Sequence, residues 1–428
     1  MEGKIVVGVD VGTYKVVTVI AKVVDDTVNV LGVSEVKSSG IRKGQVVDIE
    51  EAVGAINASV EGSERMAGYN VSHVIASISG SQIESQNSHG VVAASTSEGE
   101  ITPSDLARVI DAAKAISIPS VRGIIHILPR NYIVDGQEGI KDPVGMSGVR
   151  LEVDTHIVTA NNVAIRNLQK AFSEVGVDVD SFAFAGYASS LSVLNDTEKE
   201  LGVVLVDIGA GTTDIAIYTE GSISYSSVLA IGARHVTNDL AIGLRISLES
   251  AEKIKLFLSQ QQNKRIIKTE DETKEIRPSD EIDLTPLNLQ EEITKVSQKT
   301  LIDGIIRPRL NEIFTMIGME IKKSGFGGQT PAGVVITGGG ALTVGIKESA
   351  RRTLAMPVRV GIPLNVKGIV DEVQHPAFST VIGLTLYGAK GVQSGTTSPF
   401  GFNMARGSLS GIGKVLRKIF EIIKSFIP

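Results

Sequence analysis

The sequence predicts an α/β fold built from two duplicated half-domains, because one strand, turn and strand pattern occurs twice. In residues 5–20, IVVGVDVGTYKVVTVI, and in residues 203–218, VVLVDIGAGTTDIAIY, an apolar strand ends at an aspartate, and a glycine-containing turn leads into a second apolar strand. These aspartates are Asp10 and Asp207. A third apolar run, VVITGGGA at residues 334–341, leads into three consecutive glycines and an expected helix.

The two turns have the composition of a phosphate-binding loop. Glycine lacks a Cβ, so backbone N–H groups can approach an anion closely, and the threonines add hydroxyl donors. We expect phosphate contacts from Gly12, Thr13, Tyr14, Lys15, Gly209, Ala210, Gly211, Thr212 and Thr213. An aspartate at a rigid strand end suits Mg²⁺, which keeps several waters, so Asp10 and Asp207 are expected to hold this ion through water.

Two familiar nucleotide motifs are absent. The sequence contains no G-x-x-x-x-G-K-[ST], and no turn completes G-x-G-x-x-G. An ordinary glycine-rich hairpin is the alternative for either turn taken alone. The second copy of the pattern favours the paired phosphate site, with the two half-domains facing each other across a polyphosphate.

Composition limits the classes of protein and partner. The 428 residues suffice for more than one domain, 42% of them are hydrophobic, and there is no Cys. This excludes disulfides, thiolate metal sites and Cys nucleophiles, in agreement with a reducing cytoplasm. The net charge of −6 argues against nucleic-acid binding. No apolar run approaches the roughly 20 residues of a membrane span, and the N-terminus enters a strand without room for a signal peptide.

Other elements follow from local patterns. Residues 79–98 turn polar and small, which marks an insertion, and Thr102 and Pro103 then suit the start of a helix to about residue 115. Further strands are expected at 28–36, 73–78, 123–128 and 132–134, and further helices at 50–60, 162–176, 343–354 and 377–388.

The region before the third glycine run is expected to be mostly helical. Ser247 suits the cap of a helix, and the charged stretch 260–283 has little periodicity, which we interpret as an exposed loop or hairpin. Residues 289–323 have a helical pattern with a break before Pro308, and Gly325 ends it.

The C-terminal segment GIGKVLRKIFEIIKSFI, residues 411–427, predicts an amphipathic helix after a flexible linker at 391–410. Its charges exclude a spanning helix, so it should lie in the plane of an anionic membrane surface. A helix that docks on its own body or on a partner is the alternative. The apolar face has Ile412, Val415, Leu416, Ile419, Phe420, Ile423, Phe426 and Ile427, and the basic residues are Lys414, Arg417, Lys418 and Lys424.

These motifs together resemble the ATPase superfamily of actin, Hsp70 and the sugar kinases. DVGTYK and DIGAGTTD are similar to its two phosphate loops, and TGGGA is similar to its adenosine loop. Longer segments resemble the FtsA family of bacterial cell-division proteins, in order through nearly the whole chain. They are GQEGIKDPVGMSGVRLEVDTHIVTA (136–160), FAGYASSLSVL (184–194) and HVTNDLAIGL (235–244).

The resemblance implies an actin-like ATPase fold, in which two duplicated ribonuclease-H-like lobes flank a nucleotide cleft and carry inserted subdomains. The first half-domain, 1A, would comprise residues 1–86, 159–202 and 370–390, and the second, 2A, residues 203–245 and 330–369. Subdomain 1C would be the insertion at 87–158, and subdomain 2B would span 246–329. The linker at 391–410 and the amphipathic helix at 411–427 would follow.

The resemblance also assigns residues to ATP. It places adenosine at Gly338, Gly339, Gly340 and Ala341, and it places Glu252 and Lys255 beside the ribose and adenine. A surface ion pair between Glu252 and Lys255 explains their spacing equally well. Many relatives carry a Glu in an E-P-x-A segment, but residues 185–188 read A-G-Y-A. Asp214 is therefore the remaining candidate to position water, and slow ATP turnover is expected.

The function implied by the resemblance is an ATP-binding protein that anchors the tubulin-like FtsZ ring at the division site. Subdomain 2B would dock FtsZ, subdomain 1C would recruit later division proteins, and the protein would form filaments and lie peripherally on the cytoplasmic face of the membrane. A type IV pilus assembly platform protein is the alternative. A small-molecule kinase would have no use for the tail, and an Hsp70-like chaperone would need a substrate domain after the lobes.

Overall fold

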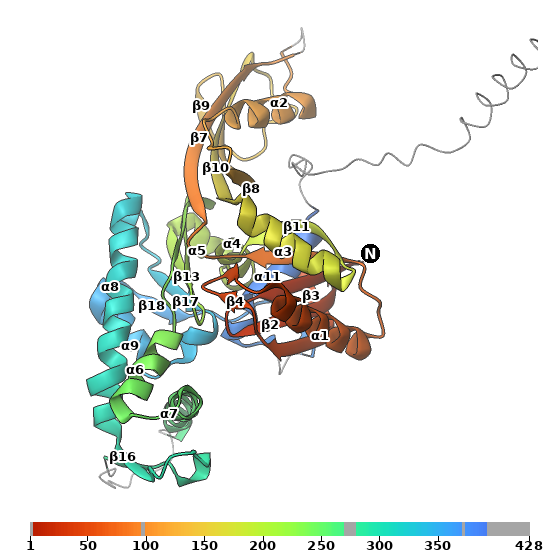
Figure 1. Ribbon diagram of the computed structural model, residues 1–428. Coiled ribbons are helices and arrows are strands. Elements are labelled where there is room, and N and C mark those ends of the chain that lie inside the picture. Colours follow the sequence, from red (N-terminus) through yellow and green to blue (C-terminus); the bar gives the residue numbers. More distant parts are fainter. Residues whose placement is uncertain (1–2, 96–98, 269–279, 370–372, 392–428) are drawn as a thin grey trace, which may run out of the picture. The chain divides into compact units, whose positions relative to one another are not determined.

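The computed structural model describes residues 3–95, 99–268, 280–369 and 373–391 (Figure 1). Contacts divide the chain into residues 1–395 and residues 396–428. The predicted amphipathic helix at 411–427, the predicted linker beyond residue 391 and the stretch 269–279 lie outside the described residues. Within the described part of the chain, no helix is long and apolar enough to cross a membrane.

The first lobe contains a six-stranded sheet in the order β11-β6-β1-β2-β3-β19. Its strands are β1 (Lys4–Val11), β2 (Lys15–Val24), β3 (Thr27–Lys37), β6 (His73–Ile78), β11 (Asp178–Phe184) and β19 (Val366–Gly368). Helices α1 (Ile49–Ala67) and α3 (Asn162–Val175) pack on one face, and α4 (Ala185–Val193) and α11 (Ser379–Ala389) pack on the other. A small hairpin, β4 (Ile41–Arg42) and β5 (Gln45–Val46), precedes α1.

The second lobe repeats this arrangement in the order β14-β13-β12-β17-β18. The strands are β12 (Val203–Ile208), β13 (Thr213–Thr219), β14 (Ser222–Leu229), β17 (Val334–Thr337) and β18 (Val358–Val360). In each lobe three strands form an antiparallel meander, and two further strands lie parallel to the first of them. The predicted duplication of an α/β half-domain is confirmed, since β3-β2-β1-β6-β11 and β14-β13-β12-β17-β18 have the same order and directions.

The second lobe packs its helices around the largest buried apolar cluster. The helices are α6 (Arg234–Leu244), α7 (Leu248–Lys268), α8 (Arg307–Ser324) and α9 (Ile346–Leu354). Gly325, at φ +80°, ends α8 as predicted. Helix α7 continues to Lys268, so the loop predicted at 260–283 is wrong for residues 260–268.

The helix predicted from residue 289 is wrong in its first part. Residues 295–297 form strand β16 (Lys295–Ser297), which pairs with β15 (Glu281–Asp283), and a short turn, Thr285–Leu287, connects towards it. A seven-residue π-helical segment, Thr300–Ile306, then leads into α8. The paired residues lie between 12 positions (Asp283 with Lys295) and 16 positions (Glu281 with Ser297) apart in the sequence. A helical periodicity does not reveal such a partner.

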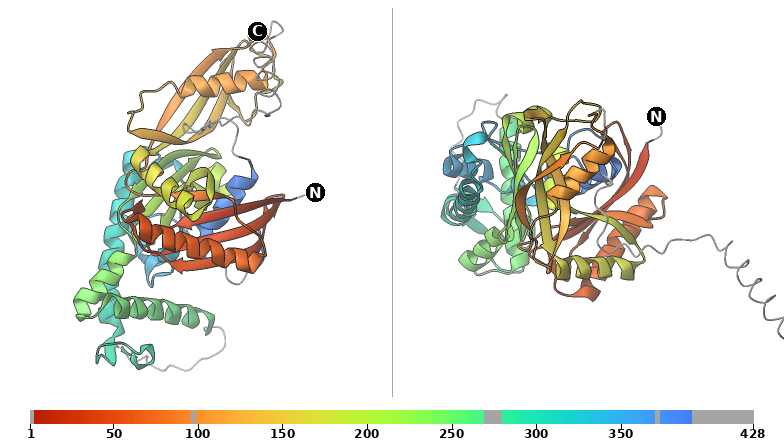
Figure 2. Two further views of the ribbon diagram at one scale, coloured as in Figure 1. Left: turned by 45° about the vertical axis from the view of Figure 1, so that its right-hand side comes forward. Right: turned by 90° about the horizontal axis from the view of Figure 1, so that it is seen from above.

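The insertion in the first lobe is a separate four-stranded sheet in the order β7-β10-β8-β9 with helix α2 packed on it (Figure 2). Its elements are β7 (Glu84–Ala93), α2 (Pro103–Ala113), β8 (Arg122–Val134), β9 (Gln137–Ile140) and β10 (Arg150–Asn161). Thr102 caps α2 through a reciprocal pair of hydrogen bonds with Asp105, as the sequence pattern predicts. The two predicted strands at 123–128 and 132–134 are one continuous strand, and the polar stretch 84–93 is also a strand.

The insertion covers the outer strand of the second lobe with polar side chains. Asn87 donates from Nδ2 to the carbonyl of Ser224 at 3.1 Å, and Ser85 donates from Oγ to the carbonyl of Ser226 at 2.7 Å. The fully buried ring of His156 lies 2.9 Å from Oγ of Ser226 and 2.7 Å from Oδ1 of Asn87. Strand β14 is therefore bound by side chains of the insertion at its open edge.

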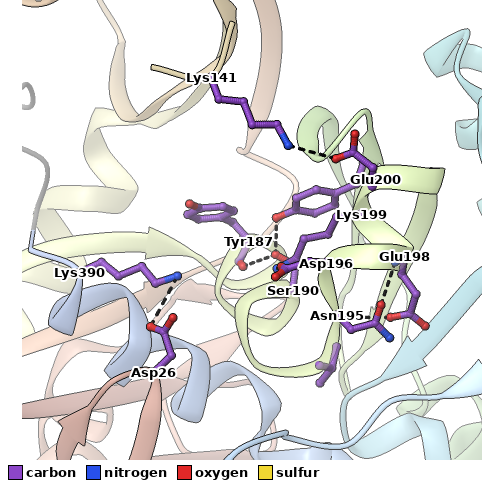
Figure 3. A network of polar contacts seen from close by, with 12 residues as sticks. Asp26, Lys141, Tyr187, Ser190, Asn195, Asp196, Glu198, Lys199, Glu200 and Lys390 are labelled. Atoms are coloured by element: carbon purple, nitrogen blue, oxygen red, sulfur yellow. Dashed lines mark hydrogen bonds and ion pairs between the residues drawn. The ribbon is translucent and has the colours of Figure 1, made fainter. Parts of the chain in front are cut away.

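A second polar network surrounds α4 and α5 (Asp196–Leu201) (Figure 3). Ser190 on α4 lies 2.5 Å from the hydroxyl of Tyr218 on β13 and donates to the carbonyl of Tyr187 at 2.6 Å. Glu200 on α5 pairs with Lys141 of the insertion at 3.4 Å (Figure 3). The connection between the lobes thus contacts both the second sheet and the insertion.

Acidification is expected to destabilise the fold through His126 and His156. Burial lowers the pKa of each ring from its ordinary value of 6.5 to about 3. The unfolded chain takes up protons below pH 6.5 and the folded chain does not, so this stability is present above pH 6.5 and is lost as pH falls towards 3. Between pH 7 and pH 5, protonation of each histidine in the unfolded chain should lower the unfolding free energy by about 2 kcal/mol.

Urea unfolding at the two pH values tests this expectation. His126→Gln and His156→Gln should each remove one histidine's share of the pH-dependent loss, whatever their stability at pH 7. A variant that retains the whole wild-type loss would contradict the assignment to that ring.

Candidate functional site

The two glycine-containing turns have the same backbone geometry. In each, the first glycine donates its N–H to the carbonyl three residues later, Gly12 to Lys15 at 3.0 Å and Gly209 to Thr212 at 2.9 Å. Each turn joins the first two strands of its sheet and follows an aspartate by two residues. The duplication therefore extends to individual hydrogen bonds around the predicted site.

The turns of the two lobes approach each other closely. A Cβ on Gly211 would lie 2.9 Å from Oγ1 of Thr13, so a side chain at this position would collide with the opposite turn. Oγ1 of Thr13 also accepts the N–H of Gly44 at 3.2 Å. The structure thus brings the two predicted phosphate turns together, one from each lobe.

The second turn also supports the start of α6. The N–H groups of Ala233 and Arg234 donate to the carbonyls of Gly209 and Ala210 at 2.9 and 3.0 Å. The hydroxyl of Thr213 donates to a backbone carbonyl, that of Ile231, at 2.8 Å. Thr213 therefore stabilises the turn internally, although the sequence predicts it as a ligand-contacting donor.

Asp207 is buried and Asp10 is partly buried, both near the ends of their strands, and hydroxyl groups hold them. Oδ1 of Asp10 accepts the hydroxyl of Ser77 at 2.7 Å. Oδ2 of Asp207 accepts the hydroxyls of Ser189 and of Thr380, the latter at 3.0 Å. Ser189 and Thr380 lie on α4 and α11 of the first lobe, so the first lobe orients an aspartate of the second.

A third acid, Asp214, lies beside them. It stands directly opposite Asp207 in the β12–β13 ladder, and Oδ1 accepts the hydroxyl of Ser79 at 2.6 Å. Residues 185–188, A-G-Y-A, form the first turn of α4 and supply no carboxylate. The structure thus places the predicted candidate Asp214 next to one of the predicted cation-holding residues.

Burial raises the pKa of all three carboxyls. Burial outweighs the hydrogen bond from Ser77 and the charge of Lys15 at Asp10. At Asp207, burial and the nearby charge of Asp10 raise the pKa to about 6. At Asp214, burial and the charge of Asp207 raise the pKa well above its ordinary value. Three acids in one buried region favour occupation by protons or by a cation.

The third glycine run packs directly against the second aspartate. Gly338 has φ +84°, and a Cβ there would overlap Oδ1 of Asp207 and lie 2.6 Å from the carbonyl oxygen of Ile208. The chain then makes a short 3₁₀ turn, Gly339–Leu342, and α9 begins at Ile346, three residues later than predicted. These glycines allow the loop to approach the end of β12, as a close backbone contact requires.

Glu252 and Lys255 form a buried group with Thr237. Lys255, which is 8% exposed, donates to Oε2 of Glu252 at 2.8 Å and to Oγ1 of Thr237 at 3.0 Å. Thr237 donates to the same carboxylate oxygen at 2.5 Å. The ion pair that the spacing allows is therefore present, with the lysine ammonium buried between α6 and α7 and Glu252 partly exposed.

Lys15 and Tyr14 have different surroundings at the first turn. The ammonium of Lys15 pairs with Glu35 at 2.6 Å and lies 4.1 Å from the centre of the Phe378 ring. Tyr14 is half exposed, and burial, followed by the charges of Glu252 and Glu35, raises the pKa of its phenol. Both residues lie at the first turn, and neither is held by the carboxylate cluster.

Sequence reasoning missed the hydroxyls that orient the three acids, which belong to Ser77, Ser79, Ser189 and Thr380. Ser77 lies on β6, Ser79 directly follows that strand, Ser189 lies on α4 and Thr380 lies on α11. In the ranges that the structure covers, no three His, Asp or Glu side chains converge to hold a metal ion directly.

The paired turns, the duplicated sheets and the glycine loop define the class of the protein, which is that of proteins with the actin-like fold. Two solved structures have this fold. A PilM–PilN type IV pilus biogenesis complex matches with a TM-score of 0.63 at 15% identity, covering 90% of this chain and 98% of that chain. MreB5 of Spiroplasma citri bound to ADP matches with a TM-score of 0.50 at 12% identity, covering 90% and 97%.

Sequence comparison narrows the class to one family. A model described as the SHS2 domain inserted in FtsA matches residues 80–159, and a model of the cell division protein FtsA matches residues 204–383. FtsA of Pseudomonas aeruginosa is 40% identical over 387 residues, which cover 90% of this chain and 89% of the relative. The chain belongs to the FtsA family of cell division proteins. The inserted sheet, Glu84–Asn161, corresponds closely to the SHS2 match.

Proposed function

We propose that this cell division protein binds ATP between its two turns and anchors a tubulin-like filament, FtsZ, to the cytoplasmic face of the membrane at the division site. Subdomain 2B, residues 246–329, docks the filament. The insertion at 87–158 recruits later division proteins and contacts neighbouring copies in filaments of the protein itself. The helix at 411–427 lies peripherally on an anionic lipid surface.

The observation that carries the nucleotide part of the proposal is the pair of equivalent turns, one after each aspartate, that meet at Thr13 and Gly211. Residues 12–15 and 209–213 offer backbone N–H groups and hydroxyls to a polyphosphate, one set from each lobe. Asp10 and Asp207 hold Mg²⁺ through water, and the ion supplies charge neutralisation for the phosphates. Gly338, Gly339, Gly340 and Ala341 receive the adenosine, and the buried pair of Glu252 and Lys255 lies beside its ribose.

The fit of a nucleotide rests on backbone access. Gly211 lies in close contact with Thr13 and Gly338 with Asp207, so neither position has room for a side chain. Glycine backbone next to carboxylates and N–H donors suits a ligand that contains phosphate groups with a bound cation.

Flotation with anionic liposomes tests the anchor. The intact chain and a chain that ends at Gly407 are compared with and without ATP and Mg²⁺. The intact chain alone should float, and ATP should increase its binding if filaments add avidity. If both chains stay in the soluble fraction under every condition, the membrane part of the proposal is wrong.

The alternative function, that of a pilus assembly platform protein, has less support, since the likeness to that complex is at 15% identity.

Lys15 provides a prediction about nucleotide affinity. Glu35 competes with phosphate for the Lys15 ammonium, so Glu35→Gln should tighten binding of a fluorescent ATP analogue by about threefold, as expected for a half-exposed pair. Lys15→Ala should weaken binding, and adding Glu35→Gln to it should give no tightening. Glu61→Gln, which breaks the exposed pair with Arg65, is the matched control and should change nothing. Tightening that persists without Lys15 would contradict the competition.

A further inference from the structure

The small hairpin of β4 and β5 reverses direction through a two-residue loop, Lys43–Gly44, that contacts the first phosphate turn. The N–H of Gly44 donates to Oγ1 of Thr13 at 3.2 Å. A Cβ on Gly44 would lie 2.8 Å from the carbonyl oxygen of Ser79, directly after β6. The loop therefore packs between the phosphate turn and the end of β6.

The backbone of this loop is unfavourable for a lysine. Both residues have positive φ, +48° at Lys43 and +74° at Gly44. Hairpin loops of this kind favour asparagine, aspartate or glycine at the first position, because a long side chain gains nothing in the left-handed region. Backbone strain of this kind is typical of binding and active sites, where the side chain has a use that offsets the strain.

The other hairpins of the chain show which residues such a loop accepts here. In the described part of the chain, three further two-residue hairpin loops have positive φ at both positions, and each begins with a carboxylate. These loops are Asp25–Asp26, Asp135–Gly136 and Glu220–Gly221. The loop that begins with a cation is thus the loop that contacts Thr13 of the phosphate turn.

The ammonium of Lys43 is available to an anion. Lys43 is exposed, and among the described residues it has no ion pair and no hydrogen bond from its side chain. Lys15, the lysine of the turn itself, is paired with Glu35 at 2.6 Å. The hairpin therefore places an unpaired cation beside a turn whose own lysine is engaged.

The position of the hairpin indicates which part of a nucleotide it would meet. The residues proposed for adenosine, 338–341, belong to the second lobe, whereas the hairpin packs on the first lobe through Val46. Ser79, which the loop contacts, donates its hydroxyl to Asp214, the predicted candidate to position the attacking water. Since that water lies next to the terminal phosphate, the terminal phosphate is the group nearest to the loop in the proposed binding mode.

We propose that Lys43 binds the terminal phosphate of ATP and thereby distinguishes ATP from ADP. This inference rests on the proposed binding of ATP between the turns. An ammonium on a flexible stem forms a charge-assisted hydrogen bond with a phosphate oxygen. ADP lacks the terminal phosphate, so Lys43 contributes to the difference in affinity between the two nucleotides.

The test uses the full-length protein with three variants. Lys43→Asn removes the cation and gives the loop its preferred Asn-Gly sequence, so the hairpin is retained. Lys43→Arg keeps the charge. Glu220→Asn is the matched control, because it creates the same Asn-Gly loop at the end of β13 that lies away from the phosphate turn.

Three quantities are measured for each protein. They are the affinity for fluorescent ADP, the affinity for a fluorescent ATP analogue that cannot be hydrolysed, and the midpoint of urea unfolding without nucleotide. Both affinities are measured with Mg²⁺. The ratio of the two affinities reports the contact with the terminal phosphate, and the midpoint reports any structural role of the loop.

Lys43→Asn should weaken binding of the ATP analogue by about tenfold, the lower end of what a hydrogen bond to a charged group contributes, and change ADP affinity by less than about twofold. Its unfolding midpoint should equal or exceed that of the wild type, because asparagine accepts this backbone conformation. Lys43→Arg should keep the preference for the ATP analogue within about threefold of the wild type. Glu220→Asn should leave both affinities unchanged.

The possible failures are distinguishable. If the wild type binds neither nucleotide, the proposed function and this inference both fall. If the wild type binds nucleotide but Lys43→Asn keeps the wild-type ratio of affinities, the inference falls and the binding proposal stands. Loss of the ratio in Glu220→Asn, or in Lys43→Arg to the same extent as in Lys43→Asn, would show that the cation is not responsible and would also overturn the inference.

Discussion

Gly338→Val is expected to abolish nucleotide binding. The new side chain would overlap Oδ1 of Asp207 and press on the carbonyl of Ile208 at 2.6 Å, so either the glycine loop or the aspartate must move. Valine is also unfavourable at φ +84°. We expect affinity for a fluorescent ATP analogue to fall by at least about 100-fold, because the loop and an acid of the site are displaced together.

Gly345→Val separates the effect of steric overlap from the effect of backbone strain. Gly345 has φ +78°, but a Cβ there has nothing within 4 Å, so this variant has the strain of the backbone without the collision. Its affinity should remain within about threefold of the wild type, as a local strain of this kind acts on stability. If Gly338→Val binds as the wild type does, with an unchanged circular dichroism spectrum, the glycine loop is not part of the nucleotide site.

Gly383→Ala is the second substitution with a large expected effect, and here the effect is on folding. A Cβ on Gly383 of α11 would overlap the carbonyl oxygen of Ala188 on α4. These two helices pack closely, and each supplies a hydroxyl to Asp207, from Ser189 and from Thr380. We expect the unfolding free energy to fall by about 3 kcal/mol, at the upper end of overpacking costs.

Urea unfolding at neutral pH measures the change, and Gly54→Ala is the control. Gly54 lies within α1, and a Cβ there has nothing within 4 Å, so alanine should stabilise the helix by up to about 1 kcal/mol. The folded fraction of the Gly383→Ala variant should also bind Mg²⁺ and nucleotide less tightly than the wild type does. The reason is that the added methyl group would force α4 and α11 apart around Asp207. Equal stability of the two glycine variants would show that the α4–α11 contact tolerates a methyl group.

The sequence predicts the duplicated framework well, because the relevant signals are local. The end of β1 at an acid, the glycine turn and the return strand are contiguous, and the structure reproduces them in both lobes down to the turn hydrogen bonds at Gly12 and Gly209. The caps of α2 and α8, at Thr102 and Gly325, are likewise local and are where the pattern indicates.

The unpredicted features depend on partners that are distant in the chain. Residues 295–297 fall within the stretch 289–323 whose pattern predicts a helix, and the pairing with residues 281–283 makes them a strand. In the sequence, Ser189 and Thr380 are ordinary small polar residues of helices. Their hydrogen bonds to Asp207 exist only in the folded structure. Burial of Lys255 was also invisible, because an E-x-x-K spacing reads the same on a surface and in a core.

The polar contact between the insertion and β14 has a consequence for solubility. A strand at the border of a sheet offers unpaired backbone groups that can recruit another chain into a growing sheet. Asn87 and Ser85 occupy the carbonyls of Ser224 and Ser226 with side chains, so the second sheet is closed to a new strand without gaining one from the insertion. A chain from which the insertion had been removed would therefore present a bare strand, and it should form intermolecular β-aggregates even if both lobes folded normally.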